Sequence, residues 1–201
     1  MNPRAVPAVT RTMLLRLAFL LLLCLHAPGH SRAADDPWRA LQEPGAIVLF
    51  RHANAPGTGD PPGFTLGDCA TQRNLDEQGR AEARAIGEAF RVRGVAVGRV
   101  LSSQWCRSRE TAELAFPGQA EEAPAFNSFF GDQASGPAQT AAALAILSQW
   151  QGPGTLVVVS HQVNISALSG IAPRPGEGII MRRDEAALRV LARLPPPDLP
   201  R

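Results

Sequence analysis

The chain has 201 residues, which at about 100–200 residues per domain is room for one compact domain with a buried core. Its residues are 45% hydrophobic and 19% charged, with a formal net charge of +2, so disordered and fibrous classes are excluded. Residues 1–33 hold four arginines and no acid, which leaves 16 of the 20 Lys and Arg against all 18 Asp and Glu. The remainder has no basic cluster with interleaved aromatic residues, and nucleic acid is excluded as a partner.

Residues 1–34 have the pattern of a secretory signal peptide. Three arginines precede the apolar run of residues 17–25, and the small residues at 31 and 33 fit a signal peptidase site. The run is shorter than the roughly 20 residues that span a bilayer, so cleavage after Ala33 or Ala34 is favoured over an uncleaved anchor. The sequence therefore predicts a periplasmic or secreted protein with no membrane span after cleavage.

The first half of the mature chain predicts a strand, a long loop and a helix. Residues 35–45 are polar and end in Pro-Gly, so we expect a lead-in segment, with order beginning at residue 46. The continuously apolar run 46–50 predicts a strand buried on both faces. Residues 54–73 are rich in Gly, Pro, Asp and Thr and predict a loop of a length that is often functional. Residues 75–94 then have helical spacing, with Asp76 as the N-cap.

The second half continues the alternation of strands and helices. We expect strands at 95–101 and 155–159, helices at 102–116, 138–150 and near 165–168, closing strands at 178–182 and 187–194, and a Pro-rich tail at 195–201. This order predicts one α/β domain at 46–194 with three layers, α/β/α, around a mostly parallel sheet.

Polar residues follow three of the predicted strands directly, as Arg51-His52, Ser102-Ser103 and Ser160-His161. Ligands bind at the carboxyl ends of the strands in such sheets, so these segments are expected to converge on one cleft. His52 and His161 are the only histidines outside the signal peptide. Either one alone is more often a structural residue, but their matched positions favour catalysis.

The segments LFRHA, SSQWCRSRETA and VVVSHQVNISALSG resemble, in order, three motifs of the histidine phosphatase superfamily, the phosphoglycerate mutase-like fold. The resemblance covers about residues 47–170 and departs at Ala53, where the family usually has Gly. It implies a phosphomonoester hydrolase in which neutral His52 attacks phosphorus and forms a phosphohistidine that water hydrolyses. Arg51, Arg107 and His161 would hold the phosphoryl oxygens.

The resemblance also implies that the enzyme needs no metal or other cofactor. The alternative for Arg107 is a solvated helix residue that pairs with Glu110 or Glu113, whereas its neighbour Arg109 is expected to pair in this way. Ser102 and Ser103 are interpreted as turn and helix-cap residues.

The proton donor of the family is missing from both of its usual positions. Gln162 stands where one branch has the Asp of an HDTN motif, and Ser128 stands where another branch has Glu. Asp132 is the nearest carboxylate and is proposed as the substitute, against the interpretation that it is an exposed loop residue. A substrate with a good leaving group is the other alternative.

The HQVN sequence and the predicted export resemble the branch of lipopolysaccharide core heptose phosphatases, which implies a small phosphorylated partner such as a sugar phosphate or the lipopolysaccharide core. A phosphate-binding or sugar-phosphate-binding protein that lacks turnover is the alternative from a different class. Phosphoryl transfer to another alcohol also stays open.

Cys69 and Cys106 are the only cysteines outside the signal peptide. In an oxidising compartment they form either a disulfide or two buried thiols, and the sequence favours neither. A zinc site built from these cysteines with His52 and His161 is a third interpretation, which no paired ligand spacing supports.

Overall fold

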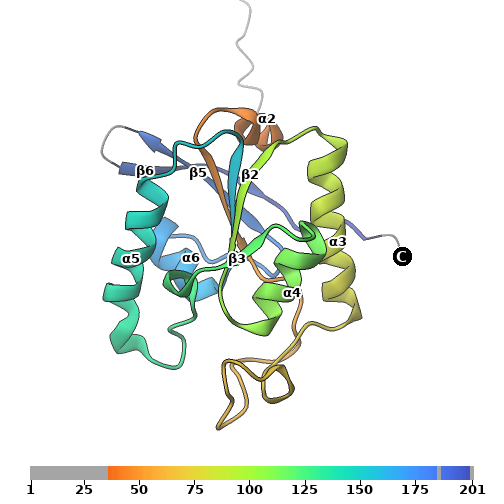
Figure 1. The fold of residues 1–201 in the computed structure, drawn as a ribbon, viewed down its shortest axis with the longest axis vertical. Helices are drawn as coiled ribbons and strands as arrows, with labels where there is room; N and C mark the ends of the chain where they lie inside the picture. The colour runs from red at the N-terminus through yellow and green to blue at the C-terminus, as the bar shows by residue number, and fades with distance from the viewer. Residues whose placement is uncertain (1–35, 185–186, 200–201) are drawn as a thin grey trace, which may run out of the picture. The chain divides into compact units, whose positions relative to one another are not determined.

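A computed structural model describes residues 36–184 and 187–199. Its centre is a six-stranded sheet of order β3-β2-β4-β1-β5-β6 (Figure 1). The strands are β1 (Ala46–Arg51), β2 (Val97–Ser102), β3 (Ala120–Glu122), β4 (Thr155–Ser160), β5 (Gly178–Asp184) and β6 (Ala187–Leu194). The pairs β1–β4, β2–β4 and β2–β3 are parallel, whereas β5 is antiparallel to both β1 and β6. The predicted fold class, with its mostly parallel sheet, is confirmed.

Helices cover both faces of this sheet. They are α2 (Pro37–Gln42), α3 (Glu77–Val92), α4 (Cys106–Ala115), α5 (Gly136–Ser148) and α6 (Gln162–Ser169). Figure 1 shows α3 and α4 on one side of the sheet and α5 and α6 on the other. Three short 3-10 helices lie in the connections, at Cys69–Thr71, Pro124–Phe126 and Gln133–Ser135.

The alternation of side chains along β1 explains why its sequence is apolar throughout. Val48 and Phe50 join the core cluster formed with α2, α3 and α4, whereas Ile47 and Leu49 join the cluster formed with α5 and α6. Successive side chains of a strand point to opposite faces, and here both faces are covered, so each position needs an apolar residue. The two clusters hold the sheet rigidly between its helices.

The expectation that order begins at residue 46 is wrong, because Pro37–Gln42 forms α2. Asp36 caps this helix by accepting a hydrogen bond from the Trp38 N–H at 3.1 Å. Leu41 is buried in the core, and its carbonyl accepts a hydrogen bond of 2.6 Å from Thr155 Oγ1 on β4. Order therefore begins before residue 46.

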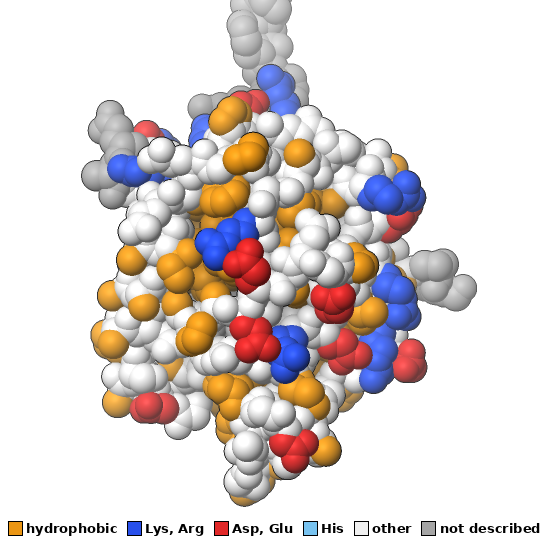
Figure 2. All heavy atoms as spheres, in the orientation of Figure 1, with side chains coloured by type: hydrophobic (Ala, Val, Ile, Leu, Met, Phe, Trp, Pro, Cys, Tyr) orange, Lys and Arg blue, Asp and Glu red, His pale blue; other side chains and the backbone are white. Residues whose placement is uncertain are grey.

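The predicted signal peptide lies outside the described residues. Residues 195–199 of the predicted tail have no regular secondary structure. In the ranges 36–184 and 187–199, no helix combines the length and the apolar character that crossing a membrane requires. Figure 2 shows acidic and basic side chains interspersed on the face that carries α4 and β3, with no histidine at this surface.

Candidate active site

The carboxyl ends of β1, β2 and β4 meet at one edge of the sheet and bring the three polar segments together. The His52 N–H donates to the Ser160 carbonyl at 2.9 Å, and the Ser103 N–H donates to the Val159 carbonyl at 2.9 Å. The loop of residues 54–73 extends beyond this edge, near the start of α4 (Figure 1). The three polar segments that the sequence places at strand ends therefore lie side by side.

His52 is held as a neutral imidazole. Its Nδ1 lies 2.8 Å from the Ala53 carbonyl oxygen, which can only accept, so Nδ1 carries the proton and Nε2 keeps its lone pair. Only 2% of the residue is exposed. Burial, assisted by the charge of Arg107, lowers the pKa of His52 to about 3. The ring therefore stays uncharged at neutral and mildly acidic pH, as a nucleophile must.

His161 lies against His52, with 5.5 Å between the ring centroids. Its Nε2 is 2.8 Å from Ser103 Oγ, and its Nδ1 is 3.5 Å from Arg107 Nη2. A guanidinium can only donate, so Nδ1 is the accepting nitrogen and Nε2 donates to the serine. Burial, followed by electrostatic coupling to the adjacent His52 ring and by the charge of Arg107, lowers the pKa of His161 well below its ordinary value.

Arg107 is buried, and only 3% of the residue is exposed. Its Nη1 donates to Asp60 Oδ1 at 2.7 Å, and its Nη2 donates to Asp60 Oδ2 at 3.2 Å. The alternative of a solvated residue that pairs with Glu110 or Glu113 is therefore wrong. The expectation for Arg109 of an exposed ion pair is confirmed, but its partner is Glu122 of β3, at 2.9 Å.

Arg51 and Arg107 each retain an unused donor. Arg51 Nη1 donates to Gln162 Oε1 at 2.8 Å and to the Pro173 carbonyl at 3.1 Å. Among the described residues, the Nε atoms of both arginines are buried and have no hydrogen-bond partner. Leaving a buried charged donor unpaired is costly, and an anionic ligand would remove that cost. These two atoms are donors that an anionic ligand could use.

Arg73 is a third guanidinium in the site that the sequence motifs did not indicate. Its Nε donates to the Gly59 carbonyl at 2.7 Å and its Nη1 donates to the Ala55 carbonyl, so the loop folds around it. Burial, and then the charge of Arg107, lowers the pKa of Arg73 to about 10, which leaves it charged at physiological pH. The site therefore combines three guanidinium groups, of which Arg107 is buried and Arg51 and Arg73 are half-buried.

Asp60 is the second residue that the motifs did not indicate. Besides Arg107, its carboxylate accepts from the Arg73 N–H at 3.1 Å and from Trp105 Nε1 at 3.0 Å, and only 8% of the side chain is exposed. Burial raises the pKa of Asp60, but hydrogen bonds and the charge of Arg107 outweigh burial, so the pKa lies below its ordinary value. The feature of the sequence that could have indicated Asp60 is its place in the long loop of residues 54–73, because loops of this length are often functional.

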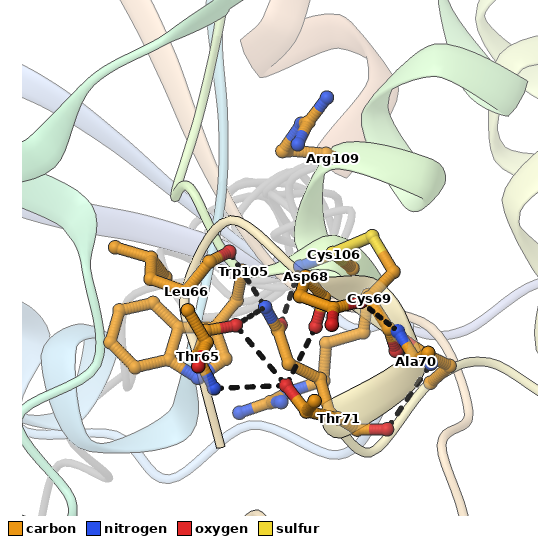
Figure 3. The surroundings of a disulfide bond; sticks show 12 residues. Thr65, Leu66, Asp68, Cys69, Ala70, Thr71, Trp105, Cys106 and Arg109 are labelled. Atoms are coloured by element: carbon orange, nitrogen blue, oxygen red, sulfur yellow. Dashed lines mark hydrogen bonds between the residues drawn. A yellow bond between two sulfur atoms is a disulfide. The ribbon is translucent and has the colours of Figure 1, made fainter.

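A disulfide joins this loop to the first residue of α4. Cys69 is bonded to Cys106, and Cys106 lies one position before Arg107 (Figure 3). Beside it, Thr71 Oγ1 donates to the Asp68 carbonyl at 2.8 Å, and the Cys106 N–H donates to Gln72 Oε1 at 3.0 Å. Both sulfur atoms are engaged in the bond, which removes the zinc site that needed them as thiolates. No cluster of three or more His, Cys, Asp or Glu able to hold a metal occurs among the described residues.

An aromatic wall borders the histidines. The Trp105 ring lies 5.4 Å from the His161 ring and 5.7 Å from the Phe64 ring, measured between centroids. Polar amides lie nearby, since Asn127 Oδ1 accepts from the Gln104 N–H at 2.8 Å. Apolar walls with a few placed polar groups are typical of sites for small molecules.

Asp132, the proton donor that the sequence indicated, is exposed. Its hydrogen bonds are made by its backbone, whose N–H donates to the Phe129 carbonyl at 3.1 Å and whose carbonyl accepts from Ser135 Oγ at 2.9 Å. Within the described part of the chain, no hydrogen bond or ion pair joins its carboxylate to the four clustered residues. Its catalytic role stays a prediction.

No protein-family model matches the sequence, and no curated protein matches it. Solved structures do. A protein histidine phosphatase SixA with tungstate is 20% identical and superposes with a TM-score of 0.55 over 75% of this chain and 97% of that one. A SixA described as a phosphohistidine phosphatase, from Agrobacterium tumefaciens, is 20% identical, with a TM-score of 0.51 over 77% and 99%.

A phosphoserine phosphatase from Entamoeba histolytica, in complex with 3-phosphoglyceric acid, is 14% identical, with a TM-score of 0.55 over 74% of this chain and 95% of that one. Identities at this level carry information about the fold and not about the substrate. The superpositions cover about three quarters of this chain and almost the whole of each neighbour. The chain has the phosphoglycerate mutase-like fold of the histidine phosphatases.

Proposed function

We propose that this chain is a phosphatase that hydrolyses phosphomonoesters through a phosphohistidine on His52. The observation that carries the proposal is the state of this side chain, a neutral imidazole with its Nδ1 proton committed to the Ala53 carbonyl and its Nε2 free. An uncharged, oriented nitrogen beside three guanidinium groups is suited to attack on phosphorus. Solved phosphatases of the same fold add support.

The reaction divides between the nucleophile and the charged groups around it. His52 Nε2 forms the N–P bond while the bond from phosphorus to the leaving oxygen breaks, and water later cleaves the N–P bond. Charge spreads over the phosphoryl oxygens during both steps, and Arg51 and Arg107 would stabilise it through their unused Nε donors. His161, whose ring lies 5.5 Å from that of His52 between centroids, is proposed as a further contact of the phosphoryl group.

The proposal includes a mechanism without a metal, because the three arginines supply the positive charge that a metal would otherwise provide. Dialysis of the purified protein against EDTA is expected to leave the rate unchanged. A loss of activity that zinc or magnesium restores would overturn this part of the proposal.

We propose a small phosphorylated substrate, with a sugar phosphate or the lipopolysaccharide core as the first candidates, in the periplasm or outside the cell. Support comes from the aromatic wall of Trp105 and Phe64 and from the disulfide, which persists in oxidising compartments. A panel of sugar phosphates, phosphoamino acids and phosphohistidine peptide, assayed for released phosphate, tests the substrate class. Fractionation of the producing cells tests the location.

The central experiment measures phosphate release from an aryl phosphate at mildly acidic pH. His52→Ala is expected to lower kcat by at least about 10³-fold, because it removes the nitrogen that forms the proposed covalent intermediate. Quenching the wild-type reaction in alkali preserves phosphohistidine, and mass spectrometry is expected to find one phosphoryl group on the peptide that contains His52. Circular dichroism checks that the variant is folded. Equal rates for the two proteins would refute the assignment.

The competing candidate is a phosphate-binding or sugar-phosphate-binding protein without turnover. The observation in its favour is the absence of an acid at the two family positions, which Gln162 and Ser128 occupy. Aryl phosphates need little protonation of the leaving group, so a true phosphatase turns them over even without an acid. Tight binding of inorganic phosphate together with no turnover of any aryl phosphate would favour the binding protein.

A further inference from the structure

We propose that Asp60 is the acid that protonates the leaving group, and that the phosphoryl group of the substrate takes the place of Asp60 on Arg107. The inference rests on the proposed phosphatase function and adds the residue that the sequence motifs leave missing. Three observations support it: the position of the carboxylate, its hydrogen bonds to both terminal nitrogens of Arg107, and the structure of the loop that holds it.

Asp60 differs from the other buried carboxylates in its position. Glu82 accepts the Asn54 N–H at 2.9 Å, and Glu177 accepts from Arg193 Nε at 2.7 Å, so both serve the scaffold behind the site. Among the described residues, Asp60 is the carboxylate that is hydrogen-bonded to one of the four predicted phosphoryl-binding side chains. An acid must reach within hydrogen-bond distance of the leaving oxygen, and this is the carboxylate nearest to doing so.

The two terminal nitrogens of the Arg107 guanidinium, here called its fork, explain how the carboxylate could be released. Both terminal nitrogens of the guanidinium donate to the two oxygens of Asp60. A phosphoryl group presents oxygens that only accept, in a geometry that suits the same fork. A phosphate dianion carries more charge than a carboxylate, so we expect it to compete effectively for Arg107. The Asp60 contact then resembles the contact that the substrate makes.

Release would also prepare Asp60 for acid chemistry. The hydrogen bonds and the charge of Arg107 are what keep its pKa low against the effect of burial. Once the phosphoryl group takes those donors, burial and the adjacent anion both favour the protonated carboxyl group. The carboxylate is therefore ionised while it holds Arg107 and becomes an acid when substrate is bound.

The loop around Asp60 combines an exposed tip with a fixed base. Residues 56–58 and 61–63 are exposed on either side of it. Gly59 precedes it and Gly63 closes the segment, and both have positive φ angles, 69° and 77°. The base is anchored by the disulfide at Cys69 and by Arg73. This arrangement lets a short segment shift the carboxylate while the rest of the site stays in place.

His52 Nε2 donates its lone pair to phosphorus, the bond from phosphorus to the leaving oxygen breaks, and that oxygen keeps the bonding electrons and takes the proton of Asp60. In the second half, the Asp60 carboxylate removes a proton from the water that attacks phosphorus, the N–P bond breaks, and its electron pair returns to His52 Nε2. The protonated acid is thereby restored.

The test compares two substrates with Asp60→Asn. For an alkyl phosphate, whose leaving group needs a proton, we expect kcat/KM to fall about 10²–10⁴-fold. For an aryl phosphate with a good leaving group, we expect a change of less than about fivefold, because protonation is not required. Asp198→Asn is the matched control, an exposed aspartate in the C-terminal segment, and is expected to leave both rates unchanged.

Three outcomes would overturn the inference. An equal loss on both substrates would mean that Asp60 only orients Arg107, and a gain on both would mean that it only blocks the site. If Asp132→Asn, and not Asp60→Asn, lost activity on the alkyl phosphate while keeping activity on the aryl phosphate, the acid would be Asp132. Asp60→Glu, which keeps the carboxyl group, is expected to recover part of the alkyl activity. A wild-type protein without any turnover would instead refute the proposed function itself.

Discussion

Ser102 and Ser103 are adjacent and almost fully buried, yet they are bonded differently. Ser103 Oγ lies 2.8 Å from His161 Nε2, whereas Ser102 Oγ has no hydrogen-bond partner among the described residues. Ser103→Ala is therefore expected to lower kcat about tenfold, which corresponds to about 1.4 kcal/mol for a lost hydrogen bond that orients the ring. Steady-state kinetics with an aryl phosphate checks the effect.

Ser102→Ala is the matched control, because it removes the same atom from a neighbouring buried position. Deleting an unpaired hydroxyl is expected to leave kcat unchanged and the free energy of unfolding unchanged or slightly higher. Similar losses of kcat in both variants would show that the Ser103 contact does not position His161.

Some residues of this site can be predicted from the sequence, and others cannot. Arg51, His52 and His161 were found because each directly follows an apolar run, and the end of a strand fixes where such residues lie. Asp60 could not be found in this way, because its partner Arg107 is 47 positions away and nothing in a loop of Gly, Pro and Asp indicates which carboxylate turns inward. Asp132 is predicted from its nearness in sequence to the family's acid position, and nearness in sequence does not measure distance in space.

Among the elements, the loop of residues 54–73 depends most on a covalent link. The disulfide closes a segment with a sequence separation of 37 between Cys69 and Cys106. By the entropy of loop closure, replacing both cysteines with serine is expected to lower the free energy of unfolding by about 3–4 kcal/mol. Urea unfolding of the wild-type protein and the double variant measures the difference.

The control for this prediction is reduction of the wild-type protein. The reduced wild-type protein is expected to match the double variant, and the double variant itself is expected to be insensitive to the reductant. An unchanged urea midpoint on reduction would show that the bond does not constrain the unfolded chain.

The predicted elements agree with the structure where every residue of a strand is buried. They disagree where an element is short or has few apolar residues. The apolar runs at 46–50 and 155–159 became β1 and β4, because a strand buried on both faces leaves no other pattern. β3 was missed because its sequence, Ala-Glu-Glu, has no apolar signal, and only its pairing with β2 makes it a strand. α2 was missed because six residues are too few for a clear helical period.

For the whole molecule, buried histidines couple stability to pH. His52 binds a proton near pH 6.5 in the unfolded chain but only near pH 3 when folded, so the unfolded state binds more protons between these values. The free energy of unfolding is therefore expected to fall as the pH is lowered from 6.5 towards 3, at up to about 1.4 kcal/mol per pH unit for each such histidine. His161, whose pKa is also lowered, acts in the same direction.

Urea unfolding between pH 7 and pH 4, with His52→Gln as the comparison, tests this expectation. The variant lacks one of the two titrating groups, so its stability is expected to decline less steeply with acid than that of the wild-type protein. Parallel curves for the two proteins would contradict the neutral, buried state assigned to His52.

The borders of the sheet have a consequence for how copies of the chain meet in solution. On one side, β3 offers only three residues, and its two glutamates are engaged by Arg99 and Arg109. On the other side, β6 carries Arg189 and Arg193, and the pairing of its neighbour β5 shifts register between Ile180 and Met181. Short, charged or irregular margins are poor templates for backbone pairing between molecules. Concentrated protein is therefore expected to remain dispersed instead of forming extended intermolecular ribbons.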